Sequence, residues 1–109
     1  MQRCLALTTA LALLTVVTSG LAWAGDGEAL YGEHCATCHG ADGRADTPVG
    51  KALKVPSLVD PKWTSADAAE ALVTAFHANP KHKAVESKVT DDELRAIAAH
   101  VAKLATAAK

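Results

Sequence analysis

Apolar residues recur at helical spacing in the second half of the chain, most clearly toward its end. One stripe consists of Leu94, Ile97, Ala98, Val101 and Leu104. Directly before it, Thr90 and Glu93 have the spacing of a capping box, in which each side chain accepts a hydrogen bond from the other residue's backbone amide. We therefore expect a capped C-terminal helix with one buried face.

A second, shorter stripe precedes this helix. It consists of Ala69, Leu72, Val73 and Phe76. Either Thr64 or Ser65 is suited to cap its start. Asn79 and Pro80 predict its end, because the residue before a proline is disfavoured in a helix.

The first half of the chain predicts one more helix and a long connection. Residues 26 to 39 form the helix, which carries Leu30 and Tyr31. Residues 40 to 61 are rich in Gly, Pro and Asp, and this composition predicts a wrapping loop with room for one brief helical turn at residues 49 to 53. The loop contains Pro48, Pro56 and Pro61. Together these patterns predict an all-α protein.

A long apolar run, residues 5 to 17, stands near the start of the chain. Arg3 precedes the run, and Ala22-Trp23-Ala24 follows it as a small-x-small cleavage site. This order is typical of a secretory signal peptide, which we expect to cover residues 1 to 24. The run is short for a transmembrane span, although an uncleaved anchor is the alternative.

Cleavage leaves residues 25 to 109 as one small domain with no membrane attachment. It also removes Cys4, so that two of the three cysteines remain. A domain of this size has a small hydrophobic core and usually needs an additional stabilising element, such as a disulfide or a bound metal. Aromatic residues make up only 4% of the chain, and the formal net charge of −1 shows no basic excess that would indicate nucleic-acid binding.

The two remaining cysteines belong to the segment Cys35-Ala36-Thr37-Cys38-His39. On a turn of helix, residues three and four apart share a face, so both thiols and the imidazole would point the same way. Two such thiols can bond to the two vinyl groups along one edge of a porphyrin, and His39 can reach the iron as the proximal ligand. The segment therefore predicts one covalently bound haem c, held through Cys35 and Cys38.

Two other interpretations of this segment are weaker. A thioredoxin-like dithiol would follow a strand in a βαβ pattern, which the flanking residues do not offer. A zinc site would have to recruit His34 or a more distant histidine, because no second Cys or His pair has finger-like spacing. With haem as the prediction, we expect the porphyrin to be the largest apolar body in the core.

Around these cysteines the chain resembles a class I c-type cytochrome, over essentially all of residues 25 to 109. The match includes Gly27, Leu30-Tyr31, the CxxCH segment with Gly40, and Ala41-Asp42-Gly43. The resemblance implies a small cytochrome c fold of three to four helices wrapped around one haem.

The segment Val55-Pro56-Ser57-Leu58 is similar to the Pro-x-Leu element of that family. The resemblance implies that the carbonyl of Pro56 accepts a hydrogen bond from His39, which fixes the tautomer of the imidazole. It also implies that Leu58 packs on the haem ring. The alternative for Pro56 is that it is only a turn proline.

The distal side departs from the family, in which the sixth iron ligand is usually a methionine. The only methionine is Met1, so methionine ligation is excluded in the mature chain. Aligned on residues 88 to 91, which resemble the Lys-Leu-Thr-Asp before the family's last helix, His82 falls on the methionine's place. We expect His82 to be the second iron ligand, with His77 as the runner-up.

The other histidines have simpler interpretations. We expect His34 to point to solvent beside the first haem cysteine. We expect His100 to pack where the first and last helices cross, at a position where the family often has an aromatic residue. For His77, the alternative to iron ligation is an interaction with the helix dipole or solvent at a helix C-terminus.

Two imidazole ligands predict a low reduction potential, because a methionine sulfur is the ligand that raises it. A six-coordinate iron without an acid–base constellation indicates a one-electron carrier and not an enzyme. Since c-type haem is attached outside the cytoplasm in bacteria, the expected location is the periplasm. Redox partner proteins would dock on a lysine-bearing surface. Its candidate residues are Lys51, Lys54, Lys81, Lys83 and Lys88.

A weak or absent bond to His82 would predict another function. The iron would then bind a diatomic gas, as in a sensor or scavenger, or would support peroxidase-like activity. A third possibility is that the chain is one subunit of a larger oxidoreductase. The spin state of the iron and its response to carbon monoxide distinguish the carrier from the gas-binding protein.

Overall fold

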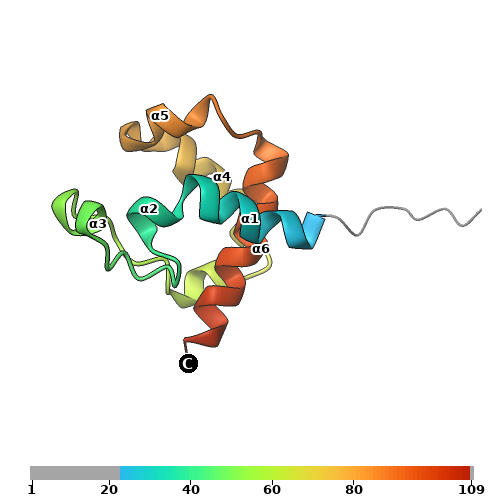
Figure 1. The fold of residues 1–109 in the computed structure, drawn as a ribbon. Helices are drawn as coiled ribbons and strands as arrows, with labels where there is room; N and C mark the ends of the chain where they lie inside the picture. The colour runs from blue at the N-terminus through green and yellow to red at the C-terminus, as the bar shows by residue number, and fades with distance from the viewer. Residues whose placement is uncertain (1–22, 109) are drawn as a thin grey trace, which may run out of the picture.

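The computed structural model describes residues 23 to 108, with side chains from residue 26. The predicted signal peptide lies outside the described residues except for its last two positions. In the described part every regular element is helical, which confirms the all-α fold (Figure 1). The long helices are α1 (Trp23–His34), α4 (Ala68–Ala78) and α6 (Asp91–Ala107). The short ones are α2 (Ala36–His39), α3 (Pro48–Ala52), α5 (Lys83–Glu86) and the 3-10 helices η1 (Pro61–Thr64) and η2 (Pro80–His82).

Helices α1 and α6 cross in direct contact, because Gly27 has no side chain. A Cβ atom at Gly27 would collide with the carbonyl oxygen of Ala96. One turn later Tyr31 is only 2% exposed, and its ring centre lies 5.1 Å from that of His100. His100 thus packs at the crossing of the first and last helices, as expected.

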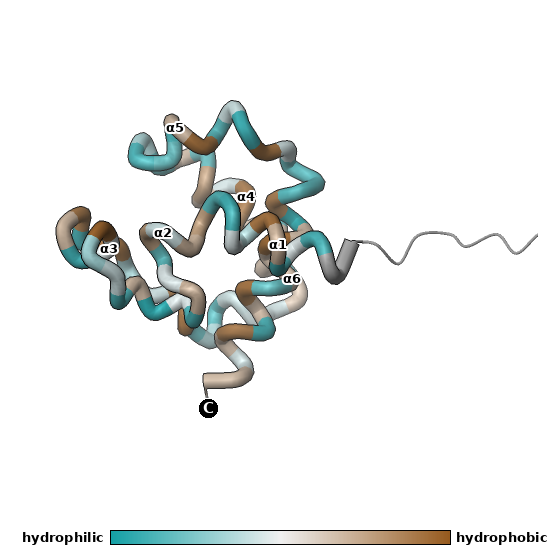
Figure 2. Tube along the Cα trace, in the orientation of Figure 1, coloured by the Kyte–Doolittle hydropathy of each residue, from teal (hydrophilic) through white to brown (hydrophobic). Residues whose placement is uncertain are grey.

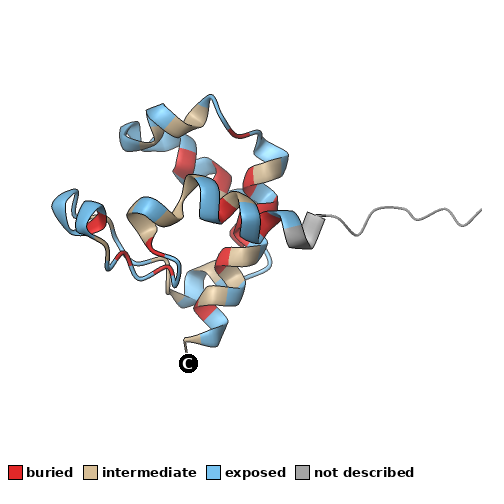
Figure 3. Cartoon of the chain, viewed as in Figure 1, coloured by how far each residue is buried: buried red, intermediate tan, exposed pale blue. Residues whose placement is uncertain are grey.

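Helix α6 supplies most of the apolar core. Its start is fixed by the predicted capping box: the Glu93 amide donates to the Thr90 hydroxyl, and the Thr90 amide donates to the Glu93 carboxylate, both at 3.1 Å. The predicted stripe is buried along the helix, and Figure 3 shows the buried segments of α1, α4 and α6 turned toward one another. The largest buried core residues are Tyr31, Val73, Phe76, Val89, Leu94, Ile97 and Val101.

Two of the predicted boundaries are wrong. The first helix begins at Trp23, and it is divided at Cys35, whose φ of −116° departs from helical values. Neither Thr64 nor Ser65 caps α4, because Pro61 starts a separate 3-10 helix that is capped by the Asp60 side chain. The two hydroxyls instead donate back to carbonyl groups of that short helix.

The predicted wrapping loop contains α3, close to the expected helical turn. Thr47 caps this helix by accepting a hydrogen bond from the Gly50 amide at 2.8 Å. The same hydroxyl lies 2.9 Å from the carbonyl oxygen of Thr37 and 3.2 Å from that of Cys38. Thr47 therefore joins α3 to the segment that contains the cysteine pair. Among the described residues no helix is long and apolar enough to cross a membrane.

Candidate functional site

The CxxCH segment forms a single helical turn after α1. Cys35 is the N-cap of α2, and Cys38 and His39 lie within α2. The turn is closed by a 2.9 Å hydrogen bond from the His39 amide to the Cys35 carbonyl. Tyr31 also holds the end of this turn in place, because its hydroxyl donates a hydrogen bond to the Gly40 carbonyl at 2.6 Å. The two thiols are free, with no disulfide between them.

The electrostatics of Cys35 do not suit dithiol redox chemistry. Burial, together with the neighbouring Cys38, raises the pKa of the Cys35 thiol to about 11. Catalytic dithiols need a cysteine whose pKa is lowered, because the thiolate is the reactive species. Cys35 is therefore not suited to repeated dithiol redox exchange.

His39 projects its imidazole into the partly buried interior. Burial is the main cause that lowers its pKa, the facing His82 lowers it further, and the backbone carbonyl of Pro56 acts in the opposite direction. The Nδ1 atom is buried and makes no hydrogen bond of good geometry within the described part of the chain. The Pro56 carbonyl lies close enough to influence the pKa of this imidazole, and the Pro-x-Leu resemblance predicts Pro56 as its acceptor.

His82 approaches from the opposite side, at the end of η2. Its Nδ1 atom lies 2.9 Å from the carbonyl oxygen of Phe76, so Nδ1 carries the hydrogen and Nε2 keeps a free lone pair. The Phe76 ring stacks on the imidazole, with ring centres 4.4 Å apart and an angle of 12° between the planes. Phe76 thus holds His82 by both its backbone and its side chain.

The spacing between His39 and His82 fits a metal ion between two imidazoles. Their ring centres are 6.4 Å apart. Two metal–nitrogen bonds of about 2 Å each, plus the distances from the nitrogens to the ring centres, require about 6 Å. In addition, the Phe76 carbonyl lies beside Nδ1 of His82, and the Pro56 carbonyl lies close to the imidazole of His39. Backbone carbonyls of this kind orient histidine ligands in metalloproteins.

Within residues 26 to 108 no three His, Cys, Asp or Glu side chains gather to hold a metal ion. A haem requires only two axial ligands, because its porphyrin supplies the other four nitrogens. The pair formed by His39 and His82 therefore meets its coordination requirement.

The remaining candidate residues lie in different surroundings. Both ring nitrogens of His77 face carboxylates, those of Glu86 and Asp91. His34 was expected to point to solvent, but its side chain is only 12% exposed, so this prediction is wrong. Leu58 is partly buried and packs against the apolar core.

Trp63 is a site residue that sequence reasoning missed. Its Nε1 donor is buried and has no partner among the described residues. Buried donors are normally paired, so an unpaired one suggests an acceptor that belongs to a ligand. The carboxylates of a haem are acceptors of this kind. The scarcity of aromatic residues is the one signal in the sequence that could have singled out this tryptophan.

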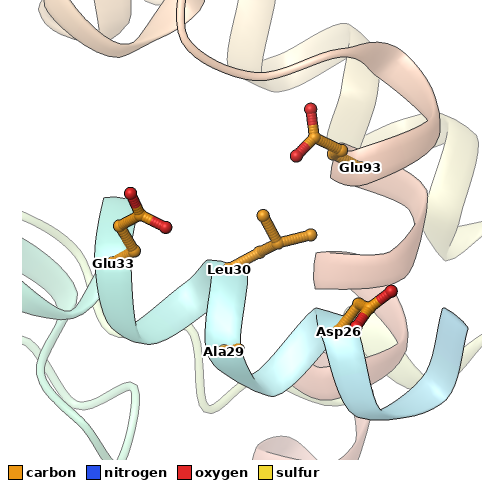
Figure 4. Close-up of a pocket in the computed structure, with 5 residues that line it drawn as sticks. All are labelled: Asp26, Ala29, Leu30, Glu33 and Glu93. Atoms are coloured by element: carbon orange, nitrogen blue, oxygen red, sulfur yellow. The ribbon is translucent and has the colours of Figure 1, made fainter. Parts of the chain in front are cut away.

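One surface pocket lies away from the histidine pair. Its walls come from α1 and from the start of α6, as Figure 4 shows. The lining residues are Asp26, Ala29, Leu30, Glu33 and Glu93. The pocket contains no imidazole or thiol, so it has no part in the arrangement described above.

Comparisons with known proteins identify relatives of the chain. Among curated proteins, the chain is similar to the cbb3-type cytochrome c oxidase subunit FixP of Rhizobium meliloti (strain 1021), with 28% identity over 78 residues. The similarity covers 69% of this chain and 25% of FixP, so the chain spans about a quarter of that relative's length. No solved structure is significantly similar to the chain.

The comparison with protein families covers most of the chain. The family described as cytochrome c oxidase, cbb3-type, subunit III matches residues 22–101. Its members are c-type cytochromes, in which a haem transfers electrons. The chain therefore belongs to the cbb3-type cytochrome c oxidase subunit III family of c-type cytochromes.

Proposed function

We propose that this chain is a monohaem electron carrier whose iron is bound by His39 and His82, with the haem attached through Cys35 and Cys38. The observation that carries the proposal is the 6.4 Å between the two imidazole ring centres, with a backbone carbonyl close to each imidazole. The haem would supply the ferric/ferrous couple. Pro56 orients His39, and Leu58 and Trp63 contact the haem.

The protein sets the properties of this site through its two imidazoles. Burial disfavours the protonated form of His39, which keeps a lone pair available. In His82 the Phe76 carbonyl accepts the Nδ1 hydrogen, so in the neutral imidazole the lone pair lies on Nε2. Two neutral imidazoles lack the stabilisation that a methionine sulfur gives to the reduced state, so the potential is low for this family.

Optical spectra with and without carbon monoxide test the ligand assignment. We expect a low-spin ferrous protein in which carbon monoxide binds slowly, because His82 must leave the iron first. His82→Ala should give a high-spin protein that binds carbon monoxide readily, while His77→Ala should stay low-spin. A high-spin wild type would contradict the carrier function and favour the gas-binding alternative.

The partner surface is proposed to lie at α3, which Figure 2 shows near the edge of the fold with hydrophobic and hydrophilic positions side by side. Val49 and Leu53 are the large apolar residues exposed there, at 39% and 46%. Lys81 reaches this segment, because its Nζ donates to the Leu53 carbonyl at 2.9 Å. Lys51 is paired with Asp46. Because the carboxylate offsets its charge, Lys51 adds less to the positive charge of the proposed partner surface.

The remaining lysines of this proposed surface are exposed: Lys54, Lys83 and Lys88. Exposed lysines together with an exposed apolar segment suit an acidic redox partner. Electron transfer to such a partner should slow as salt increases, because salt screens the attraction. A rate that does not change with salt would contradict the proposed surface.

The family match also favours a role with a terminal oxidase. FixP is a subunit of a cbb3-type cytochrome c oxidase, and this chain corresponds to about a quarter of it. As a second candidate function, the chain would work as an oxidase subunit and not as a free carrier. Co-purification with an oxidase in mild detergent would support this role, and recovery of the chain alone would support the free carrier.

We further propose export to the periplasm, which rests on residues 1 to 24. The mature protein should begin at Gly25 and carry the mass of one haem. Intact-mass measurement of protein recovered from the periplasm tests both points. A mass that includes residues 1 to 24 would support the uncleaved anchor instead.

A further inference from the structure

The loop that carries His82 leaves α4 at Asn79 and reaches α6 at Thr90. Within the loop, η2 and α5 follow one another without a break. The last turn of α4 contacts the loop through two successive residues. Phe76 binds His82 directly, and His77 binds the far side of the loop.

His77 contacts both the end of α5 and the start of α6. Its Nδ1 atom lies 3.0 Å from the Glu86 carboxylate, and its Nε2 atom lies 2.8 Å from the Asp91 carboxylate. Carboxylates only accept hydrogen bonds, so both ring nitrogens carry hydrogen and the imidazole is a cation. We call this cluster of His77, Glu86 and Asp91 the His77 bridge.

The His77 bridge connects the two ends of the His82 loop to each other and to a residue within it. It joins residue 77, before the loop, to residue 86, within the loop, and to residue 91, after it. Without the bridge, the contacts with Phe76 and the turn at Asn79 hold His82 in place. A loop fixed at both ends has fewer alternative conformations, so a ligand on it leaves the metal less often.

We propose that His77 is a positioning residue: the His77 bridge keeps His82 at the iron and so controls how readily an external ligand takes its place. This inference rests on the proposed ligation by His39 and His82. It assigns to the runner-up histidine a function other than iron ligation. It predicts that ligand exchange is changed by a substitution at a residue that does not itself bind the iron.

The test is the rate at which carbon monoxide binds to the ferrous holoprotein in stopped-flow experiments. His82 must leave before carbon monoxide binds, so the observed rate reports the opening of the loop. His77→Gln removes the cation, and we expect the rate to rise about three- to tenfold, as the loss of exposed ion pairs allows. The His77→Gln protein should remain low-spin before carbon monoxide is added.

The chain offers a matched control. Arg95 of α6 pairs with Glu70 of α4 at 2.7 Å, so Glu70→Gln also breaks an exposed ion pair between these two helices. This pair does not touch the His82 loop. Glu70→Gln should therefore bind carbon monoxide at the wild-type rate, whereas a general loosening of the fold would accelerate both variants.

Two further variants keep the test decisive. Glu86→Gln breaks one half of the bridge and should give a smaller acceleration, even if His77→Gln fails to yield holoprotein. His77→Arg restores a cation that can face two carboxylates and should return the rate toward wild type. Equal rates in wild type, His77→Gln and Glu86→Gln would overturn the proposal.

The failure of the proposed ligation has a different signature. If His82→Ala has the spectrum of the wild type, His82 is not the ligand, and both proposals fail. If His77→Gln itself becomes high-spin, His77 is the ligand and the positioning role is wrong. If His82→Ala alone becomes high-spin, and wild type, His77→Gln and Glu86→Gln bind carbon monoxide at equal rates, the ligation stands and the positioning role fails.

Discussion

At the scale of single residues, the resemblance to class I c-type cytochromes aligns His82 with the usual methionine ligand. His82→Met should raise the reduction potential, because the thioether stabilises the ferrous state. The rise should be on the order of 0.1 V, within the range of about 0.8 V that axial ligands span. Redox titration of the two purified proteins measures it, and an unchanged potential would mean that residue 82 does not bind the iron.

Individual site residues differ in how far the sequence can predict them. Cys35, Cys38 and His39 are predictable because covalent attachment requires fixed local spacing. His82 is predictable only through its alignment with the family's methionine, together with the absence of that methionine. Phe76 and Trp63 are not predictable, since stacking on His82 and an unpaired buried donor arise from tertiary contacts.

At the scale of elements, the crossing of α1 and α6 depends on a glycine. Gly27→Ala would place a methyl group against the backbone of Ala96 and force the helices apart. We expect a loss of about 1 to 3 kcal/mol, typical of overpacking. Chemical denaturation of the ferric holoprotein measures the change in unfolding free energy.

Gly32 provides the control on the same helix. A Cβ atom there would meet no heavy atom within 4 Å. Gly32→Ala should therefore stabilise the protein by about 0.5 to 1 kcal/mol, because alanine favours helix more than glycine. Equal effects of the two substitutions would show that close packing at Gly27 does not hold the crossing together.

Helix boundaries show where local signals suffice. The start of α6 is predictable because Thr90 and Glu93 satisfy each other within four residues. The start of α4 is not, because Asp60 and Pro61 form a competing 3-10 helix just before it. The kink at Cys35 also has no signal in the hydrophobic pattern.

At the scale of the whole molecule, the His77 bridge makes stability depend on pH. The hydrogen bonds that His77 donates to Asp91 and Glu86 raise the pKa of its imidazole above the usual value of 6.5. The bridge therefore stabilises the fold fully below that value, and this contribution is lost as pH rises through the raised pKa. Solvent screening keeps the effect small, because the side chain is 37% exposed.

The contribution of the His77 bridge is measured as the difference in thermal midpoint between wild type and His77→Gln. Wild type should be more stable near pH 6, and the difference should shrink at higher pH. Glu70→Gln serves as the control, because it leaves the bridge in place, so its difference from wild type should not change in this range. A His77→Gln difference that is constant or grows with pH would contradict the ionic bridge.

The overall architecture is predictable to the extent that helix periodicity and the haem motif determine it. The contacts between the elements are not predictable in this way. Helix α3 is joined to the cysteine turn by the Thr47 hydroxyl. Helix α4 is joined to the His82 loop by Phe76 and His77. These contacts join residues 6 to 14 positions apart. No local pattern in the sequence specifies them.

The central claim is that His39 and His82 together bind one haem iron. Electron paramagnetic resonance of the ferric holoprotein at low temperature tests it most directly. We expect the wild-type protein to give a low-spin signal typical of two imidazole ligands. His82→Ala should convert this signal to high spin. A high-spin signal in the wild-type protein, or a low-spin signal that survives His82→Ala, would contradict it.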